Sequence, residues 1–127
     1  MVQNSLALHF FAILEEMSKR SGLGEFELMI LLSLIRLGDE AYGVPISKEL
    51  LRATGREVAL GSVYAALDRL EKKGFVASTL GDPTPARGGR AKRYFRVTKT
   101  GLREVRTTRT ALMNLWRGLP LAQGEHP

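Results

Sequence analysis

The chain has 127 residues, which suits one ordinary domain and argues against a multidomain enzyme with separate lobes for substrate and cofactor. Hydrophobic residues make up 44% and charged residues 25%, values near the globular average that exclude a disordered tail or a collagen-like repeat. The absence of cysteine excludes disulfides and thiolate sites and fits a reducing cytoplasm.

The formal net charge of +6 is concentrated in the middle of the chain. Residues 56–109 hold thirteen basic and five acidic residues, whereas residues 1–55 hold five basic and seven acidic ones. Nucleic acid is the expected partner of such a segment, ahead of an anionic membrane surface. The apolar run 6–14 is too short for a membrane span and lacks the flanks of a signal peptide, so we expect a cytoplasmic protein with no membrane partner.

Helices are predicted for the first half of the chain. Apolar residues at helical spacing indicate an N-terminal helix within residues 1–23, and residues 24–37 follow as an almost wholly apolar helix. Neighbours must enclose that second helix, either in the domain core or in a dimer interface. Two amphipathic helices are predicted over 44–54, with Pro45 in the first turn, and over 60–73; Gly55 and Gly74 end them.

A hairpin and a last helix are predicted for the second half. Residues 75–80 and 93–98 have the length and β-branched content of strands, and the glycines and prolines of 81–91 indicate a long mobile tip. The last helix should begin at Thr98 or Thr100 and extend to Leu119, with apolar residues at the steps of a short coiled coil. Residues 120–127 should form a flexible tail.

This order of elements predicts a mainly α-helical chain with a small β-hairpin. The expected architecture is a winged helix-turn-helix domain over residues 24–98, flanked by the N-terminal helix (1–23) and a C-terminal dimerisation helix (99–119). In such domains the third helix enters the major groove of DNA. Residues 87–96 would form part of the wing and contain no acid; their basic residues include Arg87, Arg90, Lys92 and Arg93. A solvated surface loop is the alternative interpretation.

The helix over 60–73 is the candidate recognition helix. Its first turn would present side chains to base edges, and its later residues would reach the flanking backbone. The residues expected to contact DNA from this helix are Gly61, Ser62, Tyr64, Ala65, Arg69 and Lys72. Tyr64 has an alternative role as a half-buried aromatic whose hydroxyl is bonded locally.

The last helix is the candidate dimerisation element. The residues expected in the dimer interface, or lining a pocket within it, are Phe10, Leu102, Val105, Arg109, Leu112, Met113 and Trp116. Trp116 either packs the dimer core or stacks a small apolar or aromatic effector between subunits. Arg109 lies either at an exposed end of the row of interface residues along this helix, the seam, or within the interface as a paired charge.

The sequence indicates no enzyme, metal site or cofactor. His9 and His126 lack the neighbours of a catalytic triad or a metal ligand set. The pairs Glu15–Glu16 and Asp39–Glu40 are adjacent in sequence, so their side chains point to different faces of a helix. We therefore expect no catalytic residues, no metal ligands and no cofactor.

Three motifs in order resemble the PadR family of bacterial transcriptional regulators. They are AYGVPI at 41–46, GSVYAALDRLEKKGFV at 61–76 and GRAKRYFRVTKTG at 89–101. By position, Ser62 and Tyr64 match the hydroxyl residue and tyrosine that open the family's recognition helix, and Arg90, Lys92 and Arg93 match its basic wing. Ala65 stands where the family usually has proline, and the first helix is longer than is usual in the short subfamily with one C-terminal helix.

The resemblance implies a winged-helix homodimer that binds operator DNA, usually as a repressor released by a small ligand or another signal. We therefore expect a sequence-specific transcriptional regulator that binds a pseudo-palindromic operator in double-stranded DNA. Two alternatives use the same fold. One is an adaptor whose basic wing docks an acidic protein, and the other is a nucleic-acid binder that ignores sequence.

Overall fold

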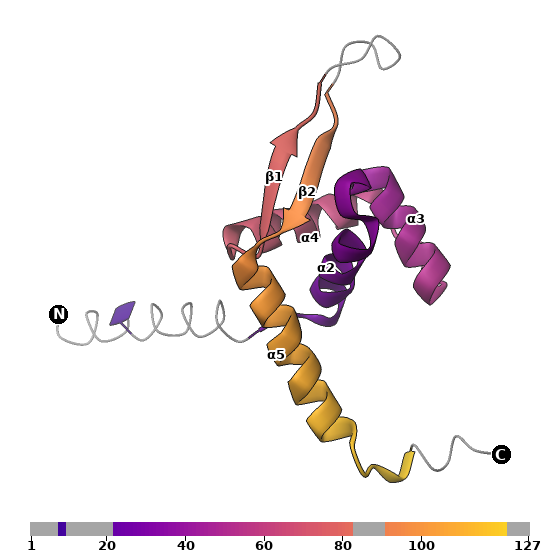
Figure 1. Ribbon diagram of the computed structural model, residues 1–127, viewed down its shortest axis with the longest axis vertical. Helices are drawn as coiled ribbons and strands as arrows, with labels where there is room; N and C mark the ends of the chain where they lie inside the picture. The colour runs from indigo at the N-terminus through magenta and orange to yellow at the C-terminus, as the bar shows by residue number, and fades with distance from the viewer. Residues whose placement is uncertain (1–7, 10–21, 83–90, 122–127) are drawn as a thin grey trace.

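The computed structural model describes residues 8–9, 22–82 and 91–121. Within these residues the elements are α2 (Glu25–Leu37), the short 3₁₀ helix η1 (Gly38–Glu40), α3 (Gly43–Thr54), α4 (Leu60–Lys72), β1 (Val76–Leu80), β2 (Arg93–Val97) and α5 (Lys99–Trp116). Helices α2, α3 and α4 pack into one body; the hairpin projects from it and α5 runs in the opposite direction (Figure 1). The predicted fold class, mainly helical with one small hairpin, is confirmed.

Local hydrogen bonds explain where three helices begin or end. The Gly24 N–H donates to Glu27 Oε1 at 3.1 Å at the start of α2. Gly55 ends α3 at φ 74°, a left-handed conformation that glycine adopts without strain. Thr98 caps α5, because its Oγ1 accepts from the Gly101 N–H at 3.0 Å and donates to the Gly74 carbonyl at 2.7 Å. Of the two predicted starts of this helix, Thr98 is therefore the correct one.

The core lies between the helical body and the base of the hairpin. Its fully buried side chains come from α2, α3 and α4 and include Ile30, Leu31, Ile46, Leu50, Val63, Leu67 and Leu70. Within the described part of the chain, neighbours enclose one side of α2, while Leu32 and Ile35 on the other side are each nearly half exposed. A dimer interface that covers these two residues stays a prediction.

The hairpin is antiparallel and tied to the helical body. Its register pairs Val76 with Val97 at the base and Leu80 with Arg93 at the far end. Phe95 is buried, and its N–H donates to the Ala41 carbonyl at 2.8 Å, just before α3. The bond fixes β2 beside η1 and α2, while β1 packs against α4, which is where a wing lies in a winged-helix domain.

Helix α5 ends at Trp116, less than one turn before the predicted end at Leu119. Arg117 is extended, Gly118 has φ 78°, and Pro120 lacks the N–H that a continuing helix needs. Among the described residues, no helix is long and apolar enough to cross a membrane. The predicted N-terminal helix and tail, together with Phe10, Arg87 and Arg90, fall wholly or largely outside the described residues.

Candidate nucleic-acid interface

Helix α4 has one buried face and one open face. Val63, Ala66, Leu67 and Leu70 are fully buried against α2, α3 and the hairpin. The opposite face is exposed along its whole length and carries Gly61, Ala65, Asp68 and Lys72 in one line, with Ser62 on its flank. This line, defined here as the α4 face, is a smooth, small-residue surface at its start and a charged one at its end.

Asp68 belongs to the α4 face and is missing from the sequence prediction. Its side chain is 58% exposed. It is three residues from Ala65 and four from Lys72, so helical spacing alone places it with these predicted contacts.

Arg69 lies off the α4 face. Its Nε is 3.5 Å from Glu27 Oε2 on α2, and Lys73 Nζ lies 2.9 Å from Glu27 Oε1. Burial acts to raise the pKa of Glu27, but hydrogen bonds from Lys73 and the Gly24 N–H, with the charges of Lys73 and Arg69, bring that pKa below its ordinary value. Arg69 is thus turned toward a structural carboxylate, although about half of its side chain remains exposed.

Arg93 of β2 is also held by the protein. Its guanidinium donates to Glu71 Oε1 at 2.7 Å and to Ser78 Oγ at 3.1 Å, and it lies 3.9 Å from Asp68 Oδ1. The Ser78 hydroxyl in turn donates to Glu71 Oε2 at 2.8 Å. These bonds join the hairpin to α4, so Arg93 sets the position of the wing relative to the α4 face and has fewer donors left for phosphate.

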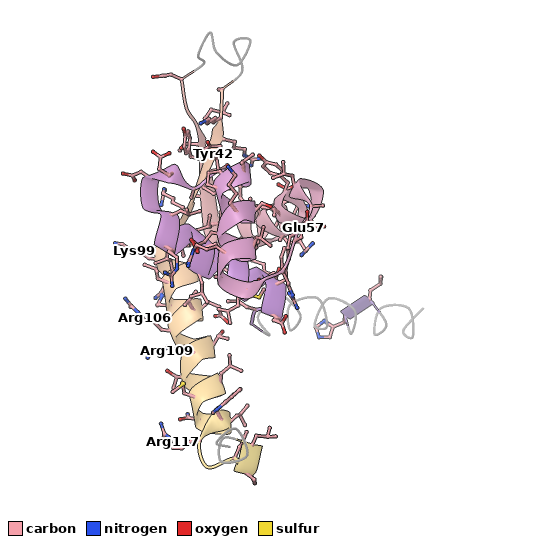
Figure 2. All side chains as sticks on the ribbon, turned by 90° about the vertical axis from the view of Figure 1, so that its right-hand side faces the viewer. Tyr42, Glu57, Lys99, Arg106, Arg109 and Arg117 are labelled. Atoms are coloured by element: carbon pink, nitrogen blue, oxygen red, sulfur yellow. The ribbon has the colours of Figure 1, made fainter. Side chains whose placement is uncertain are left out.

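Lys92 belongs to an aromatic stack beside the far end of the two strands. Its Nζ lies 3.9 Å from the ring centroid of Tyr42, and the rings of Tyr42 and Tyr94 meet edge to face with centroids 5.5 Å apart. Tyr42 precedes α3, and Figure 2 labels it at the top of the helical body, beside the hairpin. The sequence analysis missed both tyrosines as parts of the site, because only the fold brings their rings together.

Tyr64 packs sideways over α3. The side chain is 39% exposed, and its ring lies 6.4 Å from that of Phe95. Its hydroxyl occupies the space above Gly43, where the Cβ of any other residue would overlap it. The ring is therefore packed against Gly43 and Phe95 and partly open to solvent, and its contact with DNA stays a prediction.

The predicted seam of α5 divides into two parts. Leu102 is partly buried and Val105 is buried, both near the helical body. Farther along, Leu112 is 49% exposed, Met113 51% and Trp116 58%, and Arg109 is exposed beside them. The distal apolar side chains therefore have little cover within their own chain.

The described residues contain no group of three His, Asp or Glu side chains arranged to hold a metal ion. The candidate site is the exposed surface made by the α4 face and the hairpin, and it presents hydrogen-bond donors and acceptors on a helix.

Solved structures of bacterial regulators are similar to the chain. A transcriptional regulator from Clostridium thermocellum is 25% identical at a TM-score of 0.61, with 80% of this chain and 89% of that chain covered. A PadR family transcriptional regulator from Eggerthella lenta is 25% identical at a TM-score of 0.60, with 94% and 99% covered. A PadR family transcription regulator from Clostridium difficile is 23% identical at a TM-score of 0.57, with 75% and 100% covered, and shows the fold alone.

No curated protein matches the chain. A family model described as the transcriptional regulator PadR-like family matches residues 31–107, from the middle of α2 to the middle of α5. The match includes the α4 face and both strands, and it covers more than half of the sequence. The chain therefore belongs to the PadR-like family of transcriptional regulators, as its three motifs predicted.

Proposed function

We propose that this regulator is a cytoplasmic homodimer that represses transcription by binding a pseudo-palindromic operator. Each protomer inserts the α4 face into a major groove and lays the hairpin along the adjacent backbone. The α5 helices join the two protomers, so the half-sites lie about one helical turn apart, or a multiple of it.

One observation carries the proposal: α4 leaves an unbroken exposed line beside the hairpin. Gly61, Ser62 and Ala65 are small, so the start of the helix can approach base edges closely. Lys72 lies about 16 Å farther along the helix, where it can reach a flanking phosphate. Family membership agrees with a regulator, and with the expectation of no enzymatic activity.

The first test is selection of bound fragments from genomic DNA at physiological salt. The best site is then titrated against a shuffled duplex of the same composition. A regulator of this kind should prefer its site by about a thousandfold or more. Equal binding to both duplexes would instead indicate a binder that ignores sequence, and no binding to either would favour the adaptor.

Two substitutions separate base contacts from phosphate contacts. Lys72→Ala should weaken binding to both duplexes and reduce the salt slope by about 0.9. Ser62→Ala should weaken binding to the selected site more than to its shuffle. Arg36→Gln is the control, because Arg36 lies on α2 beside Glu49. If Ser62→Ala acts equally on both duplexes, the assignment of base contacts to α4 is wrong.

The distal apolar residues of α5 support the homodimer and a small apolar effector between its subunits. Trp116 and Met113 are both more than half exposed in the single chain, so a partner helix or a flat ligand would remove apolar surface from water. Trp116→Ala should dissociate the dimer. A normal dimer that no longer responds to its inducer would instead assign Trp116 to a ligand pocket.

Repression itself is tested with a reporter gene placed behind the selected site. Deletion of the regulator should raise reporter expression, and restoring the wild-type chain should lower it again. Lower expression after deletion would make the protein an activator.

A further inference from the structure

One side of α5 carries cations along its whole length. Lys99, Arg103 and Arg106 follow one another at steps of four and three residues, Arg109 borders them, and Arg117 returns to the same side at the end of the helix. All five are exposed, and Figure 2 shows Lys99, Arg106, Arg109 and Arg117 along one edge of the helix. We call this set the α5 stripe.

The α5 stripe differs from the cations of the helical body. Six cations of the body and hairpin each lie within 4.0 Å of a carboxylate: Arg36, Arg52, Arg56, Arg69, Lys73 and Arg93. Lys48, Lys72, Lys92 and Arg96 have no such contact with a described residue. Among the described residues, no carboxylate lies within that distance of any cation of the α5 stripe. A row of like charges repels itself, so an anionic partner would stabilise it.

Between the cations lie side chains that donate hydrogen bonds. Two shallow grooves, of about 430 and 440 Å³, run along this side of α5 and share Arg106, Thr110 and Asn114. Arginine, threonine and asparagine are donors commonly found on phosphate oxygens in protein–DNA contacts. The side chains therefore suit a phosphate backbone better than an isolated carboxylate.

Apart from Arg109, which borders the predicted dimer interface, the α5 stripe lies away from both surfaces of the proposed function. Leu112 and Leu115 occupy the side of the helix opposite Lys99, Arg103 and Arg106, so a dimer formed through these leucines leaves the three cations open. Met113 and Trp116 lie at the border between the two sides, beside Arg109. Helix α5 also runs away from the hairpin (Figure 1). A short straight duplex bound to the α4 face and hairpin would therefore not extend along the stripe.

We propose that the α5 stripe binds the phosphate backbone of a second DNA duplex, so that one regulator holds two DNA segments together. The stripe is about 27 Å long, and each strand of DNA carries a phosphate for about every 3.4 Å of its axis. Its length therefore suits several successive phosphates. An acidic protein fits less well, because the Asp and Glu side chains that it would bring to the stripe are depleted at the centre of protein interfaces. The proposal rests on the proposed function for the first duplex only.

The test is a bridging assay on the full chain. The selected operator duplex is immobilised, the protein is bound to it, and a fluorescent duplex of random sequence is added in solution. The wild-type protein should capture the second duplex. The variant Arg103→Gln/Arg106→Gln/Arg117→Gln should bind the operator as before and lose at least about tenfold of the captured duplex.

The matched control is Arg36→Gln/Arg52→Gln/Arg56→Gln. It removes three charges from arginines that already contact carboxylates, and it should bridge normally. Melting temperature and sedimentation of both variants establish that folding and assembly are unchanged.

Direct titration of the random duplex gives a readout that does not need the operator. The stripe variant should reduce the salt slope by about 2.7 relative to the control, since each lost phosphate contact removes about 0.9. Normal operator binding with no bridging and equal slopes would overturn the second duplex site and leave the proposed function intact. Loss of operator binding together with a reduced slope would support the second duplex site and overturn the proposed function. Equal slopes together with binding of polyglutamate to the stripe would assign it to an acidic protein.

Discussion

Helices α4 and α5 are both amphipathic, but their apolar side chains differ in burial. The apolar residues of α4, including Val63 and Leu67, are fully buried by their own chain. In α5 burial ends after Val105, and Leu112 and Leu115 are 49% and 73% exposed. The period of a helix shows that an apolar face exists, but it does not show whether the partner is in the same chain.

The charges of the two helices repeat the contrast. At the end of α4, Arg69 and Lys73 are bonded to Glu27 of α2, whereas the arginines of α5 have no such carboxylate among the described residues. A count of basic residues therefore overstates the cations that α4 offers to DNA and hides those that α5 presents elsewhere.

The largest expected effect comes from truncating one leucine in each helix. Leu67→Ala should lower the free energy of unfolding by about 2 to 5 kcal/mol, because it opens a cavity in the core. Leu112→Ala should lower the free energy of unfolding of the isolated chain by less than about 1 kcal/mol. Its main effect should be weaker self-association. Urea denaturation at low protein concentration and sedimentation separate the two quantities.

The outcome that would break this contrast is an equal loss of unfolding free energy in both variants at a concentration where the protein is monomeric. The distal part of α5 would then pack against its own chain.

The next effect comes from replacing one glycine in each of α4 and α5 with alanine, and the two changes in stability should have opposite signs. Gly101 lies against the hairpin, where a Cβ would overlap the Phe75 carbonyl and come within 2.8 Å of Val97 Cγ1. Gly101→Ala should therefore destabilise the protein by about 2 kcal/mol despite the better helix propensity of alanine. Gly61→Ala meets open space and should stabilise it by up to about 1 kcal/mol. Thermal unfolding of the pair is the measurement.

The sequence predicted the local features of the fold and not those that depend on residues distant in the chain. Apolar spacing, Pro45 and Gly55 placed the helices to within about a residue at most ends, because such local signals act within a few residues. The role of Gly101 was not predictable, since its constraint comes from Phe75, which lies 26 positions earlier in the chain. The end of α5 was missed because its coiled-coil period continues past the extended Arg117.

The third effect concerns the ion pairs between α2 and α4. Glu27→Gln should lower the free energy of unfolding at pH 7 by about 2 kcal/mol, because it leaves Lys73 partly buried without its counter-charge. The control is Glu25→Gln, whose exposed pair with Arg56 should contribute less than about 1 kcal/mol.

The pH dependence of that effect has a definite sign. The pKa of Glu27 is lowered in the folded state relative to its ordinary value of 4.5. The stabilisation is therefore present above pH 4.5 and is lost as pH falls through the lowered pKa. Urea denaturation of wild type and Glu27→Gln from pH 7 to pH 3 should show curves that converge in acid. Parallel curves would mean that Glu27 does not carry the interaction.

The functional surface was less predictable than the fold. Pattern and charge identified α4 and the hairpin, but Arg69 and Arg93 reach Glu27 and Glu71, which are 42 and 22 positions away. A side chain with several donors takes the acceptor that tertiary structure brings nearest, and sequence spacing does not reveal that choice. Asp68 was the opposite case, because the spacing that selected Ala65 and Lys72 also selects it.

Asp68→Asn is the smallest expected change and the sharpest test of the α4 face. Stability should change by less than about 0.5 kcal/mol, because the carboxylate is exposed and 3.9 Å from Arg93. Affinity for a random duplex should rise about threefold, since one charge that repels phosphate is removed. Preference for the selected site should fall about fivefold if the carboxylate accepts from a cytosine amino group, because asparagine is suited to adenine.

Glu25→Gln serves again as the control, because it neutralises a carboxylate that lies on α2 and pairs with Arg56. It should leave both affinities unchanged. A rise in affinity for the random duplex in both variants would show that net charge alone is responsible. A rise confined to Asp68→Asn with unchanged site preference would place Asp68 near the DNA backbone. The two affinities together therefore decide whether the acid on α4 excludes wrong sequences or only weakens binding to every sequence.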